Sequence, residues 1–219
     1  MKVILFGASG MVGQGVLREC LISAEVEKVL SIGRSASGSK HDKLRDIVLA
    51  DVNKIESVAD SLRGYDACFF CLGASSSGLS EARYTEVTYD LTILIASVLL
   101  EVNPDLTFIF ISGAGTDSSE KGRIMWARVK GRTENALLKL PFKAAYMLRP
   151  GVIQPLHGIK SKTWQYQILY TLMTPALPLL KRLMPGQVTT TEQIGRAMIK
   201  LAVRGGEKAV LETRDINEL

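Results

Sequence analysis

The sequence has few cysteines and histidines, and their positions exclude several common kinds of site. Three cysteines and two histidines occur in 219 residues. An odd number of cysteines gives no disulfide framework, which indicates a reducing compartment. Neither a second cysteine pair nor clustered histidines accompany Cys68 and Cys71, so the usual zinc-site spacings are excluded. The two cysteines lie in a predicted buried strand, where residues three apart point to opposite faces, and we interpret them as core residues.

The sequence also lacks segments that would divide the chain, cross a membrane or coat a nucleic acid. No Pro/Gly/Ser-rich linker and no block of like charge interrupts it, so we expect one domain over 1–219. The apolar residues 2–7 are too few for a signal-peptide core, and we expect a cytoplasmic protein. The net charge is +5, but the basic residues are scattered. This favours a phosphorylated cofactor and a small-molecule substrate over nucleic acid.

The most informative feature that is present is a glycine-rich turn between an apolar strand and a helical pattern. Gly7 permits the tight turn, Gly10 lets the backbone approach a pyrophosphate, and Gly13 lets the helix lie close to the sheet. The helix N-terminus then faces the phosphates with its free N–H groups. The spacing predicts a dinucleotide-binding turn, and the cofactor-binding residues expected in it are Gly7, Ser9, Gly10, Met11, Val12 and Gly13.

Apolar strand patterns alternate with helical patterns along the rest of the chain. Strands are expected at Lys28–Arg34, Ile47–Asp51, Ala67–Gly73, Leu106–Gly113, Ala144–Val152 and Ala209–Thr213. Helices are expected at Ile55–Arg63, from about Ser80 to Val102, from about Ile124 to Leu140, and at Glu192–Val203 behind Thr191 as N-cap. This alternation predicts a parallel sheet covered on both faces, which is a doubly wound α/β Rossmann fold with three layers, α/β/α. Ligands of such folds bind beyond the carboxyl ends of the strands.

The residues after the second strand indicate which dinucleotide is bound. An NAD site usually places Asp or Glu against the ribose 2′-hydroxyl, whereas this chain has Arg34. A cation there suits the 2′-phosphate of NADP, so we expect NADP(H) as the cofactor. Asp51, at the end of the third expected strand with Val52 behind it, is positioned to meet the adenine edge. It could equally be the N-cap of the next helix.

Seven short motifs resemble one superfamily. They are the glycine turn at 7–13, Gly-Arg-Ser at 33–35, Asp51-Val52, Cys71-Leu-Gly-Ala74, Ile111-Ser-Gly113, Lys130-Gly131 and Arg149-Pro-Gly-Val152. Together they resemble the short-chain dehydrogenase/reductase superfamily, in its atypical, NAD(P)-dependent epimerase-like or NmrA-like branch. They are also similar to the Tat-interacting oxidoreductase-like proteins, which share the Gly-Arg turn and a V-K-G helix motif. The resemblance implies further cofactor contacts from Val52, Leu72, Gly73, Ala74, Lys130 and Val152.

The catalytic residues implied by the resemblance are incomplete in this chain. The family uses a Ser or Thr that polarises the substrate oxygen, a Tyr that exchanges the proton and a Lys four residues later. The matching positions are Ser112, Trp126 and Lys130. An indole N–H donates but has no accessible acid–base equilibrium, so Trp126 cannot carry the proton. Ser112 lies at a strand end, but Gly113 falls nearer to the expected position, and Ser118 and Ser119 follow in the loop.

Two classes of function are compatible with this departure. In the first, the protein is an oxidoreductase or epimerase-like enzyme for a small carbonyl or hydroxyl compound. The proton then comes from Lys130, Tyr84, Tyr89, a water or the substrate. In the second, it binds NADPH without turnover, as a redox sensor or scaffold. His157, in a segment that could border the substrate, is a candidate substrate contact.

The apolar stretch at 163–184, interrupted by Pro175 and Pro178, departs from the alternation. It is too short and too interrupted to span a bilayer. We interpret residues 153–185 as a cap on the substrate side. The alternative is peripheral membrane contact or a dimer element through 164–184, because lysines and an arginine flank it.

Overall fold

The computed structural model describes residues 1–159 and 186–219. The expected cap over 153–185 is therefore described only through residue 159, and the stretch at 164–184 lies outside the described residues. Within the described ranges, no helix is long and apolar enough to cross a membrane.

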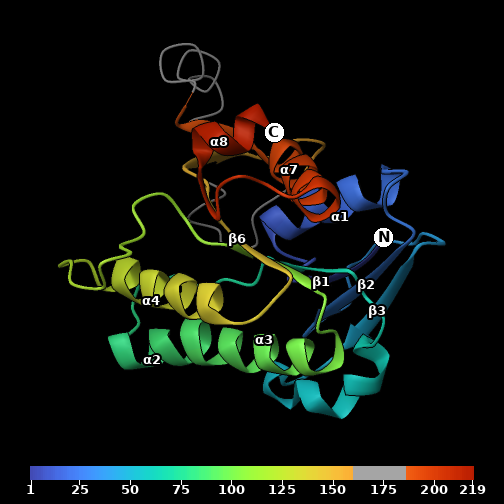
Figure 1. The fold of residues 1–219 in the computed structure, drawn as a ribbon, viewed down its shortest axis with the longest axis horizontal. Helices are drawn as coiled ribbons and strands as arrows, with labels where there is room; N and C mark the ends of the chain where they lie inside the picture. Colours follow the sequence, from blue (N-terminus) through green and yellow to red (C-terminus); the bar gives the residue numbers. More distant parts are fainter. Residues whose placement is uncertain (160–185) are drawn as a thin grey trace.

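A seven-stranded parallel sheet forms the centre of the molecule and confirms the predicted Rossmann fold (Figure 1). Its strand order is β3-β2-β1-β4-β5-β6-β9, and every neighbouring pair is parallel. The strands are β1 (Lys2–Phe6), β2 (Lys28–Gly33), β3 (Leu44–Val48), β4 (Ala67–Phe70), β5 (Thr107–Ile111), β6 (Ala144–Arg149) and β9 (Val210–Glu212). The order reverses beside β1, which is the switch point where doubly wound folds bind their ligands.

Helices cover both faces of this sheet, so the strands are buried on two sides. Figure 1 shows α1 (Met11–Ile22), α7 (Thr191–Arg204) and α8 (Thr213–Glu218) above the sheet. Below it lie α2 (Glu81–Thr85), the π-helical η2 (Glu86–Asp90) and α3 (Leu91–Val102), which together form one long helix, and α4 (Met125–Lys139). Val3 and Leu5 of β1 pack into the cluster with α1 and α7, whereas Ile4 and Phe6 pack into the opposite cluster. This two-sided burial explains the continuous apolar strands.

The C-x-x-C cysteines follow the same alternation. Cys68 is buried in the cluster that contains Ile4, and Cys71 packs against the cluster that contains Val3. The prediction that the two thiols lie on opposite faces is confirmed; Cys68 is a core residue, whereas Cys71 is half-buried just past the end of β4. Burial raises the pKa of both thiols, and all three cysteines are free thiols.

Several local features differ from the sequence-based prediction. The third strand is β3, Leu44–Val48, rather than Ile47–Asp51, and the helix expected after it is a 3-10 segment, η1 (Val52–Leu62), with a kink at Lys54. The strand expected at Ala144–Val152 ends at Arg149, because Pro150 has no N–H to donate to a ladder. The chain then forms β7 (Val152–Gln154), which pairs with β8 (Val188–Thr190) in a separate two-stranded sheet. Thr190, one residue earlier than expected, is the N-cap of α7.

Candidate functional site

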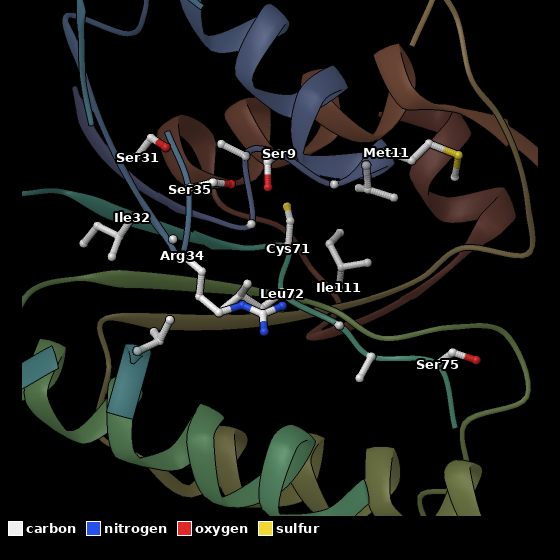
Figure 2. Close-up of a pocket in the computed structure, with 18 of the residues that line it drawn as sticks. Ser9, Met11, Ser31, Ile32, Arg34, Ser35, Cys71, Leu72, Ser75 and Ile111 are labelled. Atoms are coloured by element: carbon white, nitrogen blue, oxygen red, sulfur yellow. The ribbon is translucent and has the colours of Figure 1, made fainter. Parts of the chain in front are cut away.

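A cavity of about 760 Å³ lies beyond the carboxyl ends of the central strands. Its walls come from the turn after β1, the ends of β2, β4 and β5, and α4 (Figure 2). Twelve of the predicted site residues line it: Gly7, Ser9, Gly10, Met11, Val12, Arg34, Val52, Leu72, Gly73, Ala74, Ser112 and Lys130. The fold therefore brings together residues that lie up to 123 positions apart, from Gly7 to Lys130.

The three glycines of the first turn have different reasons to be glycine. Gly7 has φ +82, and an added Cβ would lie 2.7 Å from the backbone of Cys71. At Gly13 an added Cβ would lie 2.0 Å from the Gly7 carbonyl oxygen, so a side chain is excluded by the protein itself. At Gly10 it would meet only the Gly7 carbonyl oxygen at 3.3 Å, and φ is −82. Gly10 lines the cavity, so the space that a side chain would fill there is the ligand's space. This cradle fits a pyrophosphate held by the N-terminus of α1.

Four predicted site residues do not line the cavity. Gly13 is buried beneath the turn, where it packs against the Gly7 carbonyl. Asp51 is the N-cap of η1, and its Oδ1 accepts from Asn53 N at 3.0 Å and from Asn53 Nδ2 at 2.8 Å. Val152 lies in β7, and its neighbours Pro150 and Ile153 contribute to the lining instead.

Trp126 is the fourth, in the first turn of α4. Its ring approaches the loop at Gly115, whose added Cβ would lie 3.6 Å from the indole Cη2. The indole therefore packs beside the loop after β5 and does not contribute to the described lining.

The charged residues in the described lining are Arg34 and Lys130, and no carboxylate lines the described part of the cavity. Arg34 follows β2 and is exposed. Figure 2 shows its side chain directed into the space that the cavity residues surround. A cavity with two cations and no acid in its described wall favours an anionic ligand that carries several phosphates.

Lys130 is held in a defined position by its neighbours. Its Nζ donates to the Ser112 carbonyl oxygen at 2.8 Å and lies 5.8 Å from the centroid of the Phe110 ring. Desolvation lowers the pKa of Lys130 to about 8, and the nearby Glu134 opposes this shift. Lys130 can therefore gain or lose its proton near neutral pH, which an ordinary lysine cannot do.

Ser112 is buried at the end of β5, and its hydroxyl lies 2.8 Å from Thr116 Oγ1. The Thr116 hydroxyl donates to the Gly113 carbonyl at 2.7 Å. A threonine hydroxyl carries one proton, so the Ser112 hydroxyl donates to Thr116 and its lone pairs remain for the cavity. In this arrangement Ser112 is an acceptor, suited to a hydroxyl group on the ligand.

A buried ion pair fixes α4 against β6 behind Lys130. Arg149 Nε donates to Glu134 Oε1 at 3.0 Å and to Oε2 at 3.2 Å, and Arg149 Nη1 lies 3.2 Å from Glu212 Oε1. Gly131 lets the backbone at Asp117 pack directly against α4, since an added Cβ would lie 1.8 Å from the Asp117 carbonyl oxygen. The V-K-G motif therefore combines the lysine of the cavity with a glycine that lets the loop between β5 and α4 contact the helix.

Other residues considered from the sequence lie outside the described lining. His157 Nε2 lies 2.8 Å from Glu192 Oε2, and Tyr89 stacks on Arg132, whose guanidinium carbon is 4.2 Å from the ring centroid. Tyr84 is buried on α2. None of the three residues contributes to the described wall of the cavity.

The sequence reasoning missed ten lining residues. They are Ala8, Ser31, Ile32, Gly33, Ser35, Cys71, Ser75, Ile111, Pro150 and Ile153. Most are immediate neighbours of predicted residues at strand ends, so strand order was the signal that could have found them. Figure 2 shows the Cys71 sulfur directed toward the turn that carries Ser9. Within the described residues, no group of three or more His, Cys, Asp or Glu side chains could hold a metal ion.

The fold and the glycine cradle define a dinucleotide-binding protein of the Rossmann class. The family model described as the NAD dependent epimerase/dehydratase family matches residues 3–121, which is more than half of the chain. The chain belongs to this family, and the resemblance to an atypical, epimerase-like short-chain dehydrogenase/reductase is confirmed. At the level of the family, a nicotinamide dinucleotide cofactor follows.

Individual proteins extend this comparison. The chain is 30% identical over 159 residues to the protein fmp52 of Emericella nidulans and 28% identical over 154 residues to HTATIP2 of Rattus norvegicus. Both alignments cover 69% of this chain but only 66% and 62% of those relatives, less than two thirds of their length. The fold is similar to that of the enzyme WbmF of Bordetella bronchiseptica, solved with NAD⁺. The TM-score is 0.67 and the identity 14%, over 99% of this chain and 76% of that one.

The expectation of a cytoplasmic protein is wrong. The relative from Emericella nidulans and those from Scheffersomyces stipitis and Debaryomyces hansenii are named mitochondrial proteins, which points away from the cytoplasm. The free cysteines and the short apolar N-terminal run are the features that favour the cytoplasm. Neither feature distinguishes the cytoplasm from another reducing compartment.

Proposed function

We propose that this protein binds NADP(H) and acts as an oxidoreductase or epimerase-like enzyme on a small carbonyl or hydroxyl compound. The main support for this proposal is the pair of cations, Arg34 and Lys130, in a cavity whose described wall has no carboxylate. Gly10 and Ser9 meet the pyrophosphate at the start of α1, and Arg34 with Ser35 meets the 2′-phosphate. Leu72, Gly73 and Ala74 flank the dinucleotide on the opposite wall.

Arg34 selects NADP(H) because its guanidinium forms charge-assisted hydrogen bonds to a phosphate and offers nothing comparable to a 2′-hydroxyl. Calorimetry with NADPH and NADH tests this directly. We expect at least about tenfold tighter binding of NADPH, which corresponds to about 1.4 kcal/mol. Arg34→Ala should remove this preference while NADH binding stays unchanged.

The matched control is Arg45→Ala, which removes an exposed arginine of the neighbouring strand β3 that is outside the described lining. The preference for NADPH should survive this change. Equal affinities in the wild type, or an Arg34→Ala variant with the wild-type preference, would overturn the assignment of Arg34.

Lys130 takes the role of proton carrier that Trp126 cannot perform. A bound nicotinamide would supply or accept the hydride. Lys130 Nζ holds the proton that passes to or from the substrate oxygen, and its pKa of about 8 suits this exchange near neutral pH. Ser112 Oγ, as an acceptor, orients a substrate hydroxyl. In the direction of carbonyl reduction the protonated lysine is needed, so kcat should fall as the pH rises through about 8.

One observation favours a second candidate function, in which NADPH binds without turnover. The position that precedes Lys130 by four residues holds Trp126, packed at Gly115 outside the described lining. A carbonyl-substrate screen that follows NADPH consumption separates the two candidates. Consumption that is lost in Lys130→Ala supports the enzyme. Binding without consumption, with a partner protein captured only in the presence of NADPH, supports the sensor or scaffold.

We also propose that residues 1–219 form one domain. The strand β1 at one end of the chain and β9 near the other belong to the same seven-stranded sheet. Limited proteolysis of the NADPH-bound protein tests this proposal. Cleavage that releases an independently folded fragment would contradict it.

A further inference from the structure

We propose that this cavity distinguishes the redox state of its cofactor and holds the reduced dinucleotide more tightly than the oxidised one, because no acidic group in its described wall balances the Lys130 ammonium. The oxidised nicotinamide ring carries a positive charge that the reduced ring lacks. The inference rests on the proposed binding site and goes beyond it, since it predicts which form of the cofactor remains bound.

The first support is the placement of the Lys130 ammonium. It lies at the end of β5, where it donates to the Ser112 carbonyl at 2.8 Å and lies over the Phe110 ring. Its two contacts are uncharged, so they hold the ammonium without neutralising it. A second positive charge brought into the same cavity is opposed by Coulomb repulsion, which is strong where water is excluded.

The second support is that the charged groups around Lys130 are already paired or also positive. On its own helix, Glu134 is bound by Arg149 of β6, which also contacts Glu212 of β9. On the cavity side, the other charged residue in the described wall is Arg34.

The elements packed against α4 add no free acid at Lys130. Glu81 of α2 pairs with Arg128, and Glu86 of η2 pairs with Arg83. Tyr89 of η2 stacks on Arg132, and burial keeps the Cys71 thiol of the cavity wall in its neutral form by raising its pKa. The remaining titratable groups on these elements are the buried Tyr84 and Tyr146 and the exposed Asp90 and Glu101, and all four lie outside the described lining.

The third support is Trp126. A tyrosine at this place could lose its proton and balance a cation beside it, whereas an indole has no accessible ionisation. Trp126 therefore supplies no negative charge beside Lys130, and the pKa of about 8 makes loss of the lysine's own proton accessible. Below pH 8 the ammonium opposes the oxidised ring, and above pH 8 the neutral amine does not. The preference for the reduced cofactor should therefore fall as the pH rises.

Calorimetry with NADPH, NADP⁺, NADH and NAD⁺ tests the inference in the wild-type protein. At about pH 6.5 the reduced form should bind at least about tenfold more tightly than the oxidised form in each pair, and at about pH 9.5 the ratio should approach one. The 2′-phosphate also titrates, but it is common to NADPH and NADP⁺ and cancels in their ratio. The pair without this phosphate provides an independent check.

Variants separate the Lys130 charge from other causes. Lys130→Met should bring the ratio close to one at every pH, and Lys130→Arg should keep the preference without its pH dependence. Lys139→Met, which removes an exposed lysine from the last turn of the same helix, should behave as wild type. Circular dichroism checks that each variant is folded. If Lys130→Met does not fold, the pH dependence of the wild-type affinity ratio tests the inference by itself.

The outcomes distinguish this inference from the proposed function. Binding of both redox forms with a ratio near one at about pH 6.5, or a preference that survives in Lys130→Met, would overturn the inference and leave the cofactor site intact. A wild-type protein that binds none of the four dinucleotides would overturn the proposed function itself.

Discussion

Gly10 and Gly13 lie in the same turn, and the structure predicts opposite consequences for their substitution. At Gly13 an added methyl group would lie 2.0 Å from the Gly7 carbonyl oxygen and 2.6 Å from its carbonyl carbon. These are backbone atoms, so the turn itself must move. Overpacking of a core costs about 1–3 kcal/mol, and we expect Gly13→Ala to lose at least about 2 kcal/mol of unfolding free energy.

At Gly10 the corresponding contact is 3.3 Å, and the backbone conformation is one that any residue adopts. Alanine is a poorer N-cap than glycine by about 0.5–1 kcal/mol, and the smaller entropy of the unfolded chain offsets this by about 0.4–1 kcal/mol. Gly10→Ala should therefore change stability by less than about 1 kcal/mol, yet its methyl group occupies the pyrophosphate's space. We expect NADPH affinity to fall at least about tenfold, and binding to be lost in Gly10→Val.

Urea unfolding and calorimetric titration of the same preparations measure the two effects separately. The crossed pattern is the decisive result: Gly10→Ala stable but deficient in binding, and Gly13→Ala destabilised. If Gly10→Ala or Gly10→Val binds NADPH as the wild type does, the reasoning that this turn cradles the phosphates is refuted.

Two further predictions concern α4. Trp126→Tyr places a phenol one turn before Lys130. If the phenol turns from the indole's place at Gly115 toward Lys130, the cation lowers its pKa, and NADPH-dependent carbonyl reduction should rise by about 10²-fold or more in a steady-state assay. A rate that does not change for a substrate that the wild type reduces would contradict this role for position 126. Glu134→Gln leaves the buried Arg149 with Glu212 as its carboxylate partner, and urea unfolding should show a loss of about 1.5–3 kcal/mol, the usual range for a hydrogen bond to a charged group. A loss below about 1 kcal/mol would show that the pair does not fix α4 against β6.

Much of the fold could be predicted because its signals are local. The strand β1 is apolar throughout and ends in glycines at fixed spacing, so its turn and the helix after it follow from a few neighbouring residues. The long helical segment at 80–102 and the helix α4 have enough turns for periodicity to be clear. Strand ends in a parallel sheet converge at one edge, which is why residues as distant as Gly7 and Lys130 could be assigned to one cavity.

The features that could not be predicted depend on contacts between distant segments. The pairing of Val152–Gln154 with Val188–Thr190 joins two three-residue strands, and neither is long enough to show a period of its own. Asp51 illustrates a second difficulty, because the sequence allowed an adenine contact or a helix cap. The choice of the cap depends on the bond from Asn53 and on β3 ending at Val48.

The final prediction concerns Lys130, whose desolvation in the cavity should make the free energy of unfolding depend on pH. In the folded protein its pKa is about 8, whereas its ordinary value is 10.5. Between these values the unfolded chain binds a proton that the folded chain does not, so this group makes stability rise with pH. The difference of about 2.5 pH units, at about 1.36 kcal/mol each, gives up to about 3 kcal/mol.

Below pH 8 both states are protonated, and the folded protein bears the full cost of desolvating the ammonium. Lys130→Met removes that cost, so the variant should be more stable than the wild type at about pH 7, and its advantage should shrink by up to about 3 kcal/mol by about pH 10. The free thiols lower the stability of both proteins in alkali because burial raises their pKa values, and this contribution cancels in the difference.

Urea unfolding of the cofactor-free proteins at several pH values measures the difference in unfolding free energy between Lys130→Met and the wild type, with Lys139→Met as the control. A difference that does not vary with pH would show that the ammonium is not desolvated in the fold. The charge on which both the proton transfer and the redox preference depend would then be that of an ordinary surface lysine.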